Sequence, residues 1–295
     1  MPNIKTVLVT GQNGQLGQSL KSLVSSYPQY QFTFTTRDEL DLACSQSINN
    51  YFEQNKFDLI INCAAYTAVD KAEEQQEIAD AINHLAVKQL AEITQKNNSI
   101  LIHISTDYVF DGTSFKPYIE NDPINPQNIY GSTKLKGEQA IQKTACNAII
   151  IRTSWVYSEY GNNFVKTMLR LGADRDQLNV IFDQIGSPTY AADLATSILT
   201  ITDSLNNNQS DFQHDKVALY HFSNEGVCSW YDFAKAIFEQ SNTQCEVFPI
   251  ETKDYPTPAK RPQYSLLNKA KIKQQYQLII PYWKDSLKVC LNKLQ

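Results

Sequence analysis

The chain lacks the features that mark several protein classes. It has no run of about 18 apolar residues that could cross a bilayer, and no charged-then-apolar leader precedes its first apolar segment. Its 26 basic and 31 acidic side chains give a formal net charge of −5, which offers no basic footprint for nucleic acid. We therefore expect no membrane or nucleic-acid partner and a cytoplasmic location.

Cysteine and histidine are sparse and form no recognisable pattern. The six cysteines show no C-x-x-C spacing, and Cys63 lies in an apolar segment, so we interpret them as reduced, mostly buried thiols. The four histidines include no H-E-x-x-H pattern. His103 lies inside the apolar run 100–104, where we expect a residue of the core or of a strand end. We predict no metal site.

Apolar strands alternate with helices through the first half of the 295 residues. We predict strands at 6–10, 32–36, 57–62, 100–104 and 148–152, and helices at about 46–54, at 79–96 and around 130–134. Strands of nearly continuous apolar character, separated by helices, are typical of a parallel sheet that is covered on both faces. The predicted fold class is therefore α/β with a doubly wound parallel sheet.

The pattern loosens beyond about residue 152, which indicates a smaller and more irregular portion. We predict helices that begin near 161, 193 and 230, a loop at 183–189 and a polar surface loop at 205–211. The prolines in 255–262 require an extended or turning segment.

The first predicted strand runs directly into a glycine-rich turn. Gly11, Gly14 and Gly17 are spaced G-x-x-G-x-x-G, and an apolar helical pattern follows. Glycine there allows a tight turn and a close approach of the backbone to a pyrophosphate, which meets the N–H groups at the start of the helix. The spacing differs by one residue from G-x-G-x-x-G, and a turn without a nucleotide is the alternative.

Tyr130 and Lys134 are four residues apart, which places them on one face of a helix. An ammonium at that position lowers the pKa of the phenol from its ordinary value near 10 and makes it a proton donor near neutral pH. The chain has 16 tyrosines, so this pair alone is equally typical of an exposed helix. The glycine turn favours the catalytic interpretation, and Thr106 adds a hydroxyl.

Cofactor choice depends on the end of the second predicted strand, about 20 residues beyond the glycines. Arg37 stands there, followed by Asp38. An arginine favours a ribose 2′-phosphate, whereas an acidic residue binds the 2′-hydroxyl. Arg37 therefore favours NADPH, and Asp38 leaves NADH possible. A solvated surface charge is the alternative for Arg37.

Six segments of the chain carry a resemblance to a known family. They are 11–17, 62–73, 105–110, 130–134, 152–157 and 258–262, and the sequences Ser-Thr-Asp-Tyr-Val-Phe and Arg-Thr-Ser-Trp-Val-Tyr are the most specific. In order and spacing they resemble the dTDP-4-dehydrorhamnose reductases, which are extended short-chain dehydrogenase/reductases. The similarity covers nearly the whole chain. It implies a Rossmann-type domain at 1–152 with segments of about 178–205, and a smaller C-terminal substrate domain at about 153–177 and 206–295.

The resemblance implies reduction of the 4-keto group of dTDP-4-dehydro-β-L-rhamnose to dTDP-β-L-rhamnose, in dTDP-L-rhamnose biosynthesis for cell-surface polysaccharide. The nicotinamide would deliver hydride while Tyr130 gives a proton to the carbonyl oxygen. Lys134 would lower the phenol pKa and hold the ribose, and Thr106 would hydrogen-bond the same oxygen. The predicted cofactor-binding residues are Gly11, Asn13, Gly14, Gln15, Leu16, Gly17, Arg37, Asp41, Leu42, Ala64, Ala65, Tyr66, Thr67, Tyr130 and Lys134.

The predicted substrate-binding residues are Thr106, Asp107, Tyr130, Trp155, Asn163, Phe164 and Arg261. The planar fork of Arg261 suits a diphosphate, and an exposed surface charge is its alternative. Ordinary core packing is the alternative for Trp155. Some members of the family pair through a magnesium site fed by acidic residues, but Ser19 and Ala192 occupy the matching positions here. We therefore expect a monomer or a dimer that needs no metal.

Two other functions remain open at the level of sequence. One is a non-catalytic protein similar to the regulatory subunit of methionine adenosyltransferase, which acts by binding a partner. The other is a nucleotide-sugar epimerase or dehydratase, because dehydratases of this superfamily use an acidic residue beside the active-site threonine, and Asp107 stands there. Oxidation of added NADPH without release of an unsaturated sugar distinguishes a reductase from both.

Overall fold

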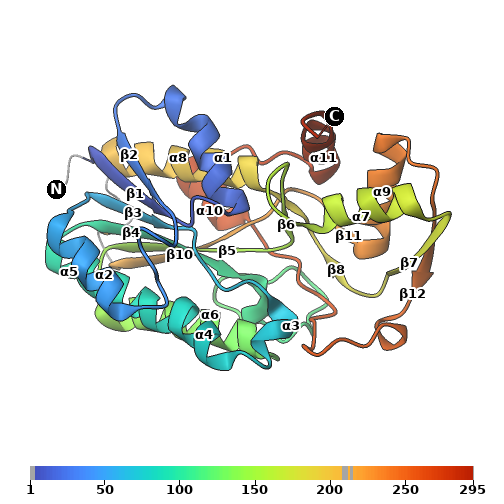
Figure 1. Cartoon of the computed structure of the whole chain (residues 1–295), viewed down its shortest axis with the longest axis horizontal. Coiled ribbons are helices and arrows are strands. Elements are labelled where there is room, and N and C mark those ends of the chain that lie inside the picture. The colour runs from blue at the N-terminus through green and yellow to red at the C-terminus, as the bar shows by residue number, and fades with distance from the viewer. Residues whose placement is uncertain (1–3, 208–211, 213–214, 295) are drawn as a thin grey trace.

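Among the residues that the computed structural model describes (4–207, 212 and 215–294), six parallel strands form one central sheet (Figure 1). In order across the sheet they are β10 (Val217–Phe222), β5 (Ala148–Thr153), β4 (Ile100–Thr106), β3 (Leu59–Asn62), β1 (Thr6–Thr10) and β2 (Gln31–Thr35). All five pairings are parallel. The predicted α/β class with a parallel sheet is confirmed.

Helices cover both faces of the sheet (Figure 1). One face carries α1 (Gln15–Leu23), α8 (Ala191–Asn207) and α10 (Ala270–Tyr276), and the other carries α2 (Ser45–Gln54), α5 (Ala86–Asn97) and α6 (Ile129–Thr144). Alternate residues of a strand point to opposite faces: Val7 and Val9 pack with the first group, and Leu8 with the second. Burial on both faces explains why these strands are apolar throughout.

A smaller lobe lies beside the sheet, on the right of Figure 1. Its helices are α7 (Phe164–Asp174), α9 (Trp230–Ser241) and α11 (Trp283–Asn292), and its short strand pairs are β6 (Val156–Tyr157) with β9 (Thr189–Tyr190), β7 (Gln177–Ile181) with β12 (Glu246–Ile250), and β8 (Ile185–Gly186) with β11 (Cys228–Ser229). All of these elements except β8 contribute to a separate apolar core around Phe233 and Trp283. The lobe therefore has its own packing centre.

The helix predicted at 79–96 is longer than expected. It begins at α4 (Gln76–Asp80) and passes through a π-helical turn (Ala81–Leu85) into α5. A π-turn inserts an extra residue into a helix and is frequent at functional sites. Here it contains Asn83, whose buried side chain supports the site described below.

The second half departs from the predicted division in several places. β10 and α10 fall in 206–295, which we assigned to the substrate portion, but β10 pairs with β5 and α10 packs on the core of the sheet. Conversely, β7, at the start of the segment 178–205, belongs to the smaller lobe.

Local loop predictions also need correction. The region 183–189 contains β8 and the start of β9, and the first part of the loop predicted at 205–211 is the end of α8; residues 208–211 lie outside the described residues. No helix among the described residues is long and apolar enough to span a membrane.

Candidate active site

A cleft of about 840 Å³ opens at the carboxyl ends of β1, β3, β4 and β5, against the smaller lobe. Ligands of open α/β sheets bind at this edge. The cleft is lined by most of the predicted residues, namely Gly11, Gly14, Gln15, Leu16, Arg37, Asp41, Leu42, Ala64, Ala65, Tyr66, Thr67, Thr106, Asp107, Tyr130, Lys134, Trp155 and Asn163. The other predicted residues, Asn13, Gly17, Phe164 and Arg261, are not part of this lining.

The glycine turn forms one end of the cleft. Gly11 has a φ of 72°, and a Cβ there would lie 2.9 Å from the backbone of Ala64, so only glycine fits without strain. Gly14 caps the start of α1 without a side-chain hydrogen bond to the helix. The first N–H groups of α1 are therefore available to an anion. Asn13 is exposed, and Gly17 is buried against Gly11 behind this surface.

The start of α6 is held against the turn that follows β4. The side chain of Asn128 accepts a hydrogen bond from the Gly131 N–H at 2.8 Å and donates one to the Lys260 carbonyl at 2.8 Å. A Cβ on Gly131 would lie 2.3 Å from the carbonyl oxygen of Tyr108. This close approach brings Tyr130 to the same region as Thr106, since both line the cleft.

The ionisation of Tyr130 differs from the prediction. Burial raises the pKa of its phenol to about 12, the Thr106 hydroxyl works in the opposite direction, and Asp107 adds to the rise. The predicted lowering of this pKa by Lys134 is not found. Burial of the phenol is the largest effect, and the Lys134 Nζ contacts other groups: it donates to the Ile104 carbonyl at 2.6 Å and lies 3.3 Å from the His103 Nε2.

Lys134 is itself almost fully buried, with 1% of its surface exposed. Burial lowers the pKa of its ammonium to about 8, and Glu138 opposes this change. Within the described part of the chain, no carboxylate lies within 4 Å of its Nζ. A cation that is buried without a contacting anion is costly, and such perturbed groups are concentrated at functional sites.

Asp107 follows Thr106 directly and is buried. The Thr106 hydroxyl donates to the Asp107 Oδ1 at 2.9 Å and accepts from the Tyr108 N–H at 3.2 Å. Burial raises the pKa of the Asp107 carboxyl to about 7, although hydroxyls of Thr106 and Ser265 oppose the rise. Near neutral pH this carboxyl therefore exists in both protonation states.

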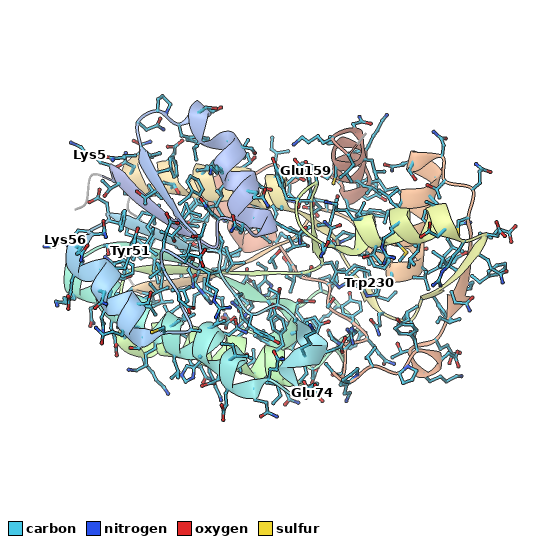
Figure 2. All side chains as sticks on the ribbon, viewed as in Figure 1. Lys5, Tyr51, Lys56, Glu74, Glu159 and Trp230 are labelled. Carbon is cyan, nitrogen blue, oxygen red and sulfur yellow. The ribbon has the colours of Figure 1, made fainter. Side chains whose placement is uncertain are left out.

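Two tryptophans form the opposite wall of the cleft. The rings of Trp155 and Trp230 are stacked, with centroids 3.6 Å apart and planes 11° apart. Trp155 adopts a φ of 48°, which is uncommon for a residue other than glycine. Trp230, labelled in Figure 2, begins α9 and was not predicted as a site residue.

Asn163 connects the two parts of the molecule. It caps α7 by accepting from the Lys166 N–H, and its Nδ2 donates to the Gln15 Oε1 of α1 at 3.0 Å. Phe164, the next residue, packs with its ring centroid 4.7 Å from that of Trp230 and joins the core of the smaller lobe. Phe164 therefore supports the tryptophan wall from behind.

Comparisons with known proteins give the family. Residues 5–295 match the family model described as the RmlD substrate binding domain. A dTDP-4-dehydrorhamnose reductase from Aggregatibacter actinomycetemcomitans is 42% identical over 288 residues, which cover 96% of this chain and 97% of the relative. The chain belongs to the dTDP-4-dehydrorhamnose reductase family.

Solved structures agree with this assignment. A dTDP-4-dehydrorhamnose reductase from Clostridium acetobutylicum has a TM-score of 0.91 at 40% identity and covers 98% of this chain and 99% of that one. A dTDP-4-dehydrorhamnose reductase from Bacillus anthracis, in complex with NADP, has a TM-score of 0.90 at 36% identity, with 98% and 99% covered. The resemblance that the motifs indicated is confirmed over the full length of this member of the reductase family.

In this member of the reductase family, Arg261 binds a carboxylate of the protein, whereas the prediction was a diphosphate of the substrate. Its Nη1 and Nη2 donate to the Asp70 carboxylate at 3.0 and 2.7 Å, and the Ala259 N–H donates to the same group. Asp70 lies in α3 (Val69–Ala72). The planar fork is thus matched by a carboxylate of the protein, and it fixes the segment 258–262 against α3.

Several residues that support the site were missed in the sequence. Asn83 accepts from the Tyr66 N–H at 2.9 Å and donates to the Tyr66 carbonyl and the Thr133 hydroxyl, so it fixes the segment after β3 to α6. Glu138 accepts from Ser105 and from Arg152 beneath the cleft. A polar residue inside an apolar pattern is the signal that would have indicated them, since buried polar groups need partners.

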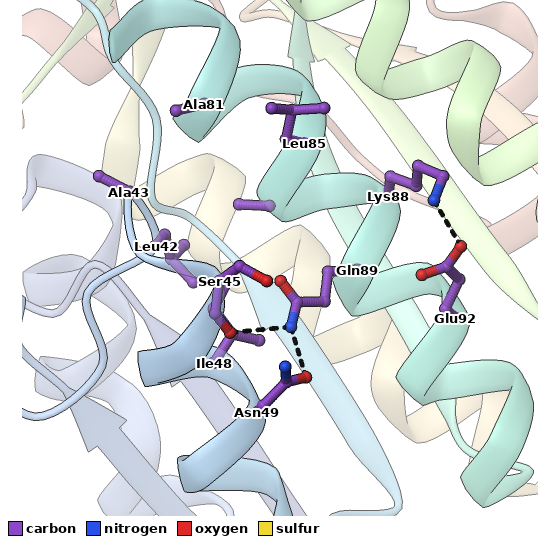
Figure 3. A pocket seen from close by; sticks show the side chains of 11 residues that line it. Leu42, Ala43, Ser45, Ile48, Asn49, Ala81, Leu85, Lys88, Gln89 and Glu92 are labelled. Carbon is purple, nitrogen blue, oxygen red and sulfur yellow. Dashed lines mark hydrogen bonds and ion pairs between the residues drawn. The ribbon is translucent and has the colours of Figure 1, made fainter.

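A second hollow, of about 440 Å³, lies between α2 and α5 (Figure 3). Leu42 and Ala43 line both this hollow and the cleft. Gln89 closes one side by donating to the Ser45 carbonyl and to Asn49, and Lys88 pairs with Glu92 at 2.7 Å (Figure 3). Gln89, Lys88 and Glu92 therefore already have partners within the lining of this hollow.

Proposed function

We propose that this chain uses NADPH to reduce the 4-keto group of dTDP-4-dehydro-β-L-rhamnose to dTDP-β-L-rhamnose, in dTDP-L-rhamnose biosynthesis for cell-surface polysaccharide. The observation that carries the proposal is the convergence of Tyr130, Lys134 and Thr106 in one cleft with the glycine turn. Family membership over the full length supports this reductase activity above the epimerase, the dehydratase and the non-catalytic binding protein.

The residues of the cleft fit a dinucleotide. Gly11 allows the close backbone approach, and the uncapped start of α1 offers N–H groups to a diphosphate. Arg37 and Asp41 line the far end of the cleft and form an ion pair at 3.4 Å. We assign Arg37 to a ribose 2′-phosphate, which supports NADPH, as does the NADP bound by the solved Bacillus anthracis relative. The bound nicotinamide supplies the hydride.

We propose Tyr130 as the proton donor. A phenol with a pKa of about 12 keeps its proton at neutral pH, and it gives that proton up only when a negative oxygen develops next to it. The Lys134 ammonium adds positive charge on the same face of α6, which favours the developing oxyanion. The Ile104 carbonyl holds the Lys134 Nζ at 2.6 Å, so this charge needs little reorganisation during the reaction.

Thr106 and Asp107 act as a pair in this proposal. The single hydroxyl proton of Thr106 points to Asp107, and a protonated Asp107 carboxyl leaves that proton free for the substrate oxygen. The tryptophan wall formed by Trp155 and Trp230, with Asn163 at its edge, would contact the dTDP-sugar. Both Nη groups of Arg261 already donate to Asp70, so we assign Arg261 to holding the segment 258–262 against α3.

Loss of the Tyr130 hydroxyl tests the proposal. General acid help is worth about 10² to 10⁴ in rate, so Tyr130→Phe should lower turnover of the keto-sugar by that factor and leave NADPH binding, measured by fluorescence titration, largely intact. Tyr51→Phe is the matched control, because Tyr51 lies on α2 at the far end of the molecule from Trp230 (Figure 2). A Tyr130→Phe enzyme within about threefold of the parent would contradict the role.

A further inference from the structure

A chain of buried polar groups runs behind Lys134. The Ala64 N–H donates to the Thr10 Oγ1 at 3.3 Å, and the Thr10 hydroxyl donates to the Asn62 Oδ1 at 2.7 Å. The Asn62 Nδ2 lies 3.1 Å from the His103 Nδ1, and the His103 Nε2 lies 3.3 Å from the Lys134 Nζ. Thr10, Asn62, His103 and Lys134 are each at most 1% exposed. The chain crosses β1, β3 and β4 and ends on α6.

The roles of donor and acceptor are fixed at every step of this chain of hydrogen bonds, starting from Ala64. Ala64 offers the Thr10 oxygen only an N–H, so the Thr10 hydroxyl proton must go to its other neighbour, Asn62. The Asn62 carbonyl oxygen therefore faces Thr10, and its amide N–H₂ faces His103. A neutral imidazole that accepts at Nδ1 carries its proton on Nε2.

The Nε2–H of His103 then points at Lys134. An ammonium has three N–H donors and no acceptor, so it cannot accept this hydrogen bond, whereas the neutral amine can. The amine still donates to the Ile104 carbonyl at 2.6 Å. This chain of hydrogen bonds therefore stabilises the neutral amine of Lys134 relative to its ammonium, which lowers the pKa of Lys134.

Building on the proposed function, we propose that Thr10, Asn62 and His103 are positioning residues that fix the place and the protonation state of Lys134, and so set the upper pH limit of the reduction. None of the three has an assigned role in the reaction above. Their effect on the sugar passes through Lys134, whose positive charge favours the developing oxyanion. Activity should fall when that charge is lost.

Other groups near this chain of hydrogen bonds also bear on the pKa of Lys134. Tyr130 and Glu138 lie one turn before and one turn after it on α6, and His103 contacts it from β4, whereas Asp107, in the turn after β4, acts on Tyr130. Glu138 raises the pKa of Lys134, but its carboxylate already pairs with Arg152 of β5 at 2.7 Å. Burial holds the pKa of His103 well below its ordinary value, so this imidazole stays neutral through the working range, as the chain requires.

The tautomer of His103 is the first test and needs no activity. Nitrogen NMR of the protein labelled with ¹⁵N-histidine should show His103 neutral with the proton on Nε2, assigned by the signal that disappears in His103→Asn. A proton on Nδ1 would overturn the proposal, because His103 would then accept from an ammonium and raise the pKa of Lys134. This readout also remains valid if the sugar substrate proves to be different.

The pH profile of turnover is the second test. The alkaline limb of the parent should fall near pH 8, the pKa of Lys134. His103→Asn keeps an amide for Asn62 and loses the Nε2–H, so the limb should move upward by about one pH unit, the equivalent of one modest hydrogen bond. Thr10→Val does not touch Lys134 but frees Asn62 to turn, and should move the limb in the same direction by less.

His221 provides the matched control, since it is a second buried histidine, its Nδ1–H donates to the Tyr118 carbonyl at 3.1 Å, and it lies outside the cleft lining. His221→Asn should leave the alkaline limb in place. An unmoved or lowered limb in His103→Asn, with the thermal melting curve showing a folded protein, would overturn the proposal. Absence of turnover in the parent would instead count against the proposed function and leave the tautomer result to decide.

Discussion

Replacing Glu138 by glutamine removes the negative half of a buried ion pair beneath the catalytic turn. Arg152 donates to the two carboxylate oxygens of Glu138 at 3.0 and 2.7 Å, and the two side chains are only 3% and 1% exposed. The Ser105 hydroxyl also donates to this carboxylate. The pair thus joins α6, which carries Tyr130 and Lys134, to the ends of β4 and β5.

The structure sets the size of the effect. Glutamine has the shape of glutamate, so Glu138→Gln creates no cavity, and the cost comes from leaving the Arg152 guanidinium buried without its anion. The remaining contacts of that guanidinium are the Glu120 carbonyl at 3.4 Å and the face of the Phe110 ring at 5.1 Å. Breaking a buried pair by removing one partner costs about 3 to 5 kcal/mol, and we expect a loss of that size in the free energy of unfolding.

Urea denaturation followed by circular dichroism measures this loss by linear extrapolation. The matched control is Glu92→Gln, which breaks the Lys88–Glu92 pair of 2.7 Å on the surface of α5, where both side chains are about half exposed. An exposed pair is worth at most about 1 kcal/mol. Equal losses in the two variants would refute the reasoning, because they would mean that burial of the Glu138–Arg152 pair has no energetic consequence.

Three further predictions concern coenzyme choice, pH and assembly. Arg37→Ala should weaken NADPH binding by about 1.5 to 3 kcal/mol, the value of a hydrogen bond to a charged group, and spare NADH; equal losses in calorimetric titrations of the two coenzymes would exclude the 2′-phosphate role. The pKa of Asp107 is raised from 3.8 to about 7, so between these two pH values the folded state binds more protons than the unfolded state. The contribution of the neutral Asp107 carboxyl to the free energy of unfolding is therefore full below about pH 4 and is lost as the pH rises through 7. Asp107→Asn should therefore raise the melting temperature at pH 8 much more than at pH 4, and parallel curves for the two proteins would argue against a buried neutral carboxyl. Ser19 and Ala192 offer no carboxylate to a hard cation, so the mass from light scattering should be the same in excess Mg²⁺ and in EDTA; a change of mass on chelation would show that other acidic residues hold a metal between subunits.

The first half of the fold could be predicted because its signals are local. The apolar run 6–10 and the glycines that follow specify β1, the turn and α1 within one short segment, and a parallel sheet requires such runs. Tyr130 and Lys134 depend only on the helical interval of four residues. The resemblance of the motifs to a known family then predicted the sugar substrate and the reaction.

The second half could not be predicted in the same way because its structure depends on distant partners. β10 enters the sheet only because it pairs with β5, and β7 pairs with β12, which lies much later in the chain. Neither pairing has a local signal. The helix α11 begins at Trp283, whose ring is buried against Phe233 of the smaller lobe, and this contact also joins segments that are far apart in the sequence.

The charged and hydrogen-bonding partners of the site residues could not be predicted from the sequence for a related reason. The interval between Tyr130 and Lys134 says nothing about what else the ammonium meets, and in the structure it meets Ile104 and His103. Arg261 was expected at a diphosphate, but Asp70, nearly two hundred residues earlier in the chain, lies opposite it. Side-chain partners of this kind are fixed by the fold, and the sequence alone does not reveal them.

The transfer of hydride to the sugar tests the central claim most directly. The purified protein is incubated with dTDP-4-dehydro-β-L-rhamnose and NADPH that carries deuterium at the transferable position of the nicotinamide C4, and the product is analysed by NMR and mass spectrometry. The proposed function predicts one NADPH consumed for each sugar and deuterium at C4 of dTDP-β-L-rhamnose. A sugar without deuterium, an unsaturated or epimerised sugar, or unchanged substrate beside intact NADPH would contradict it.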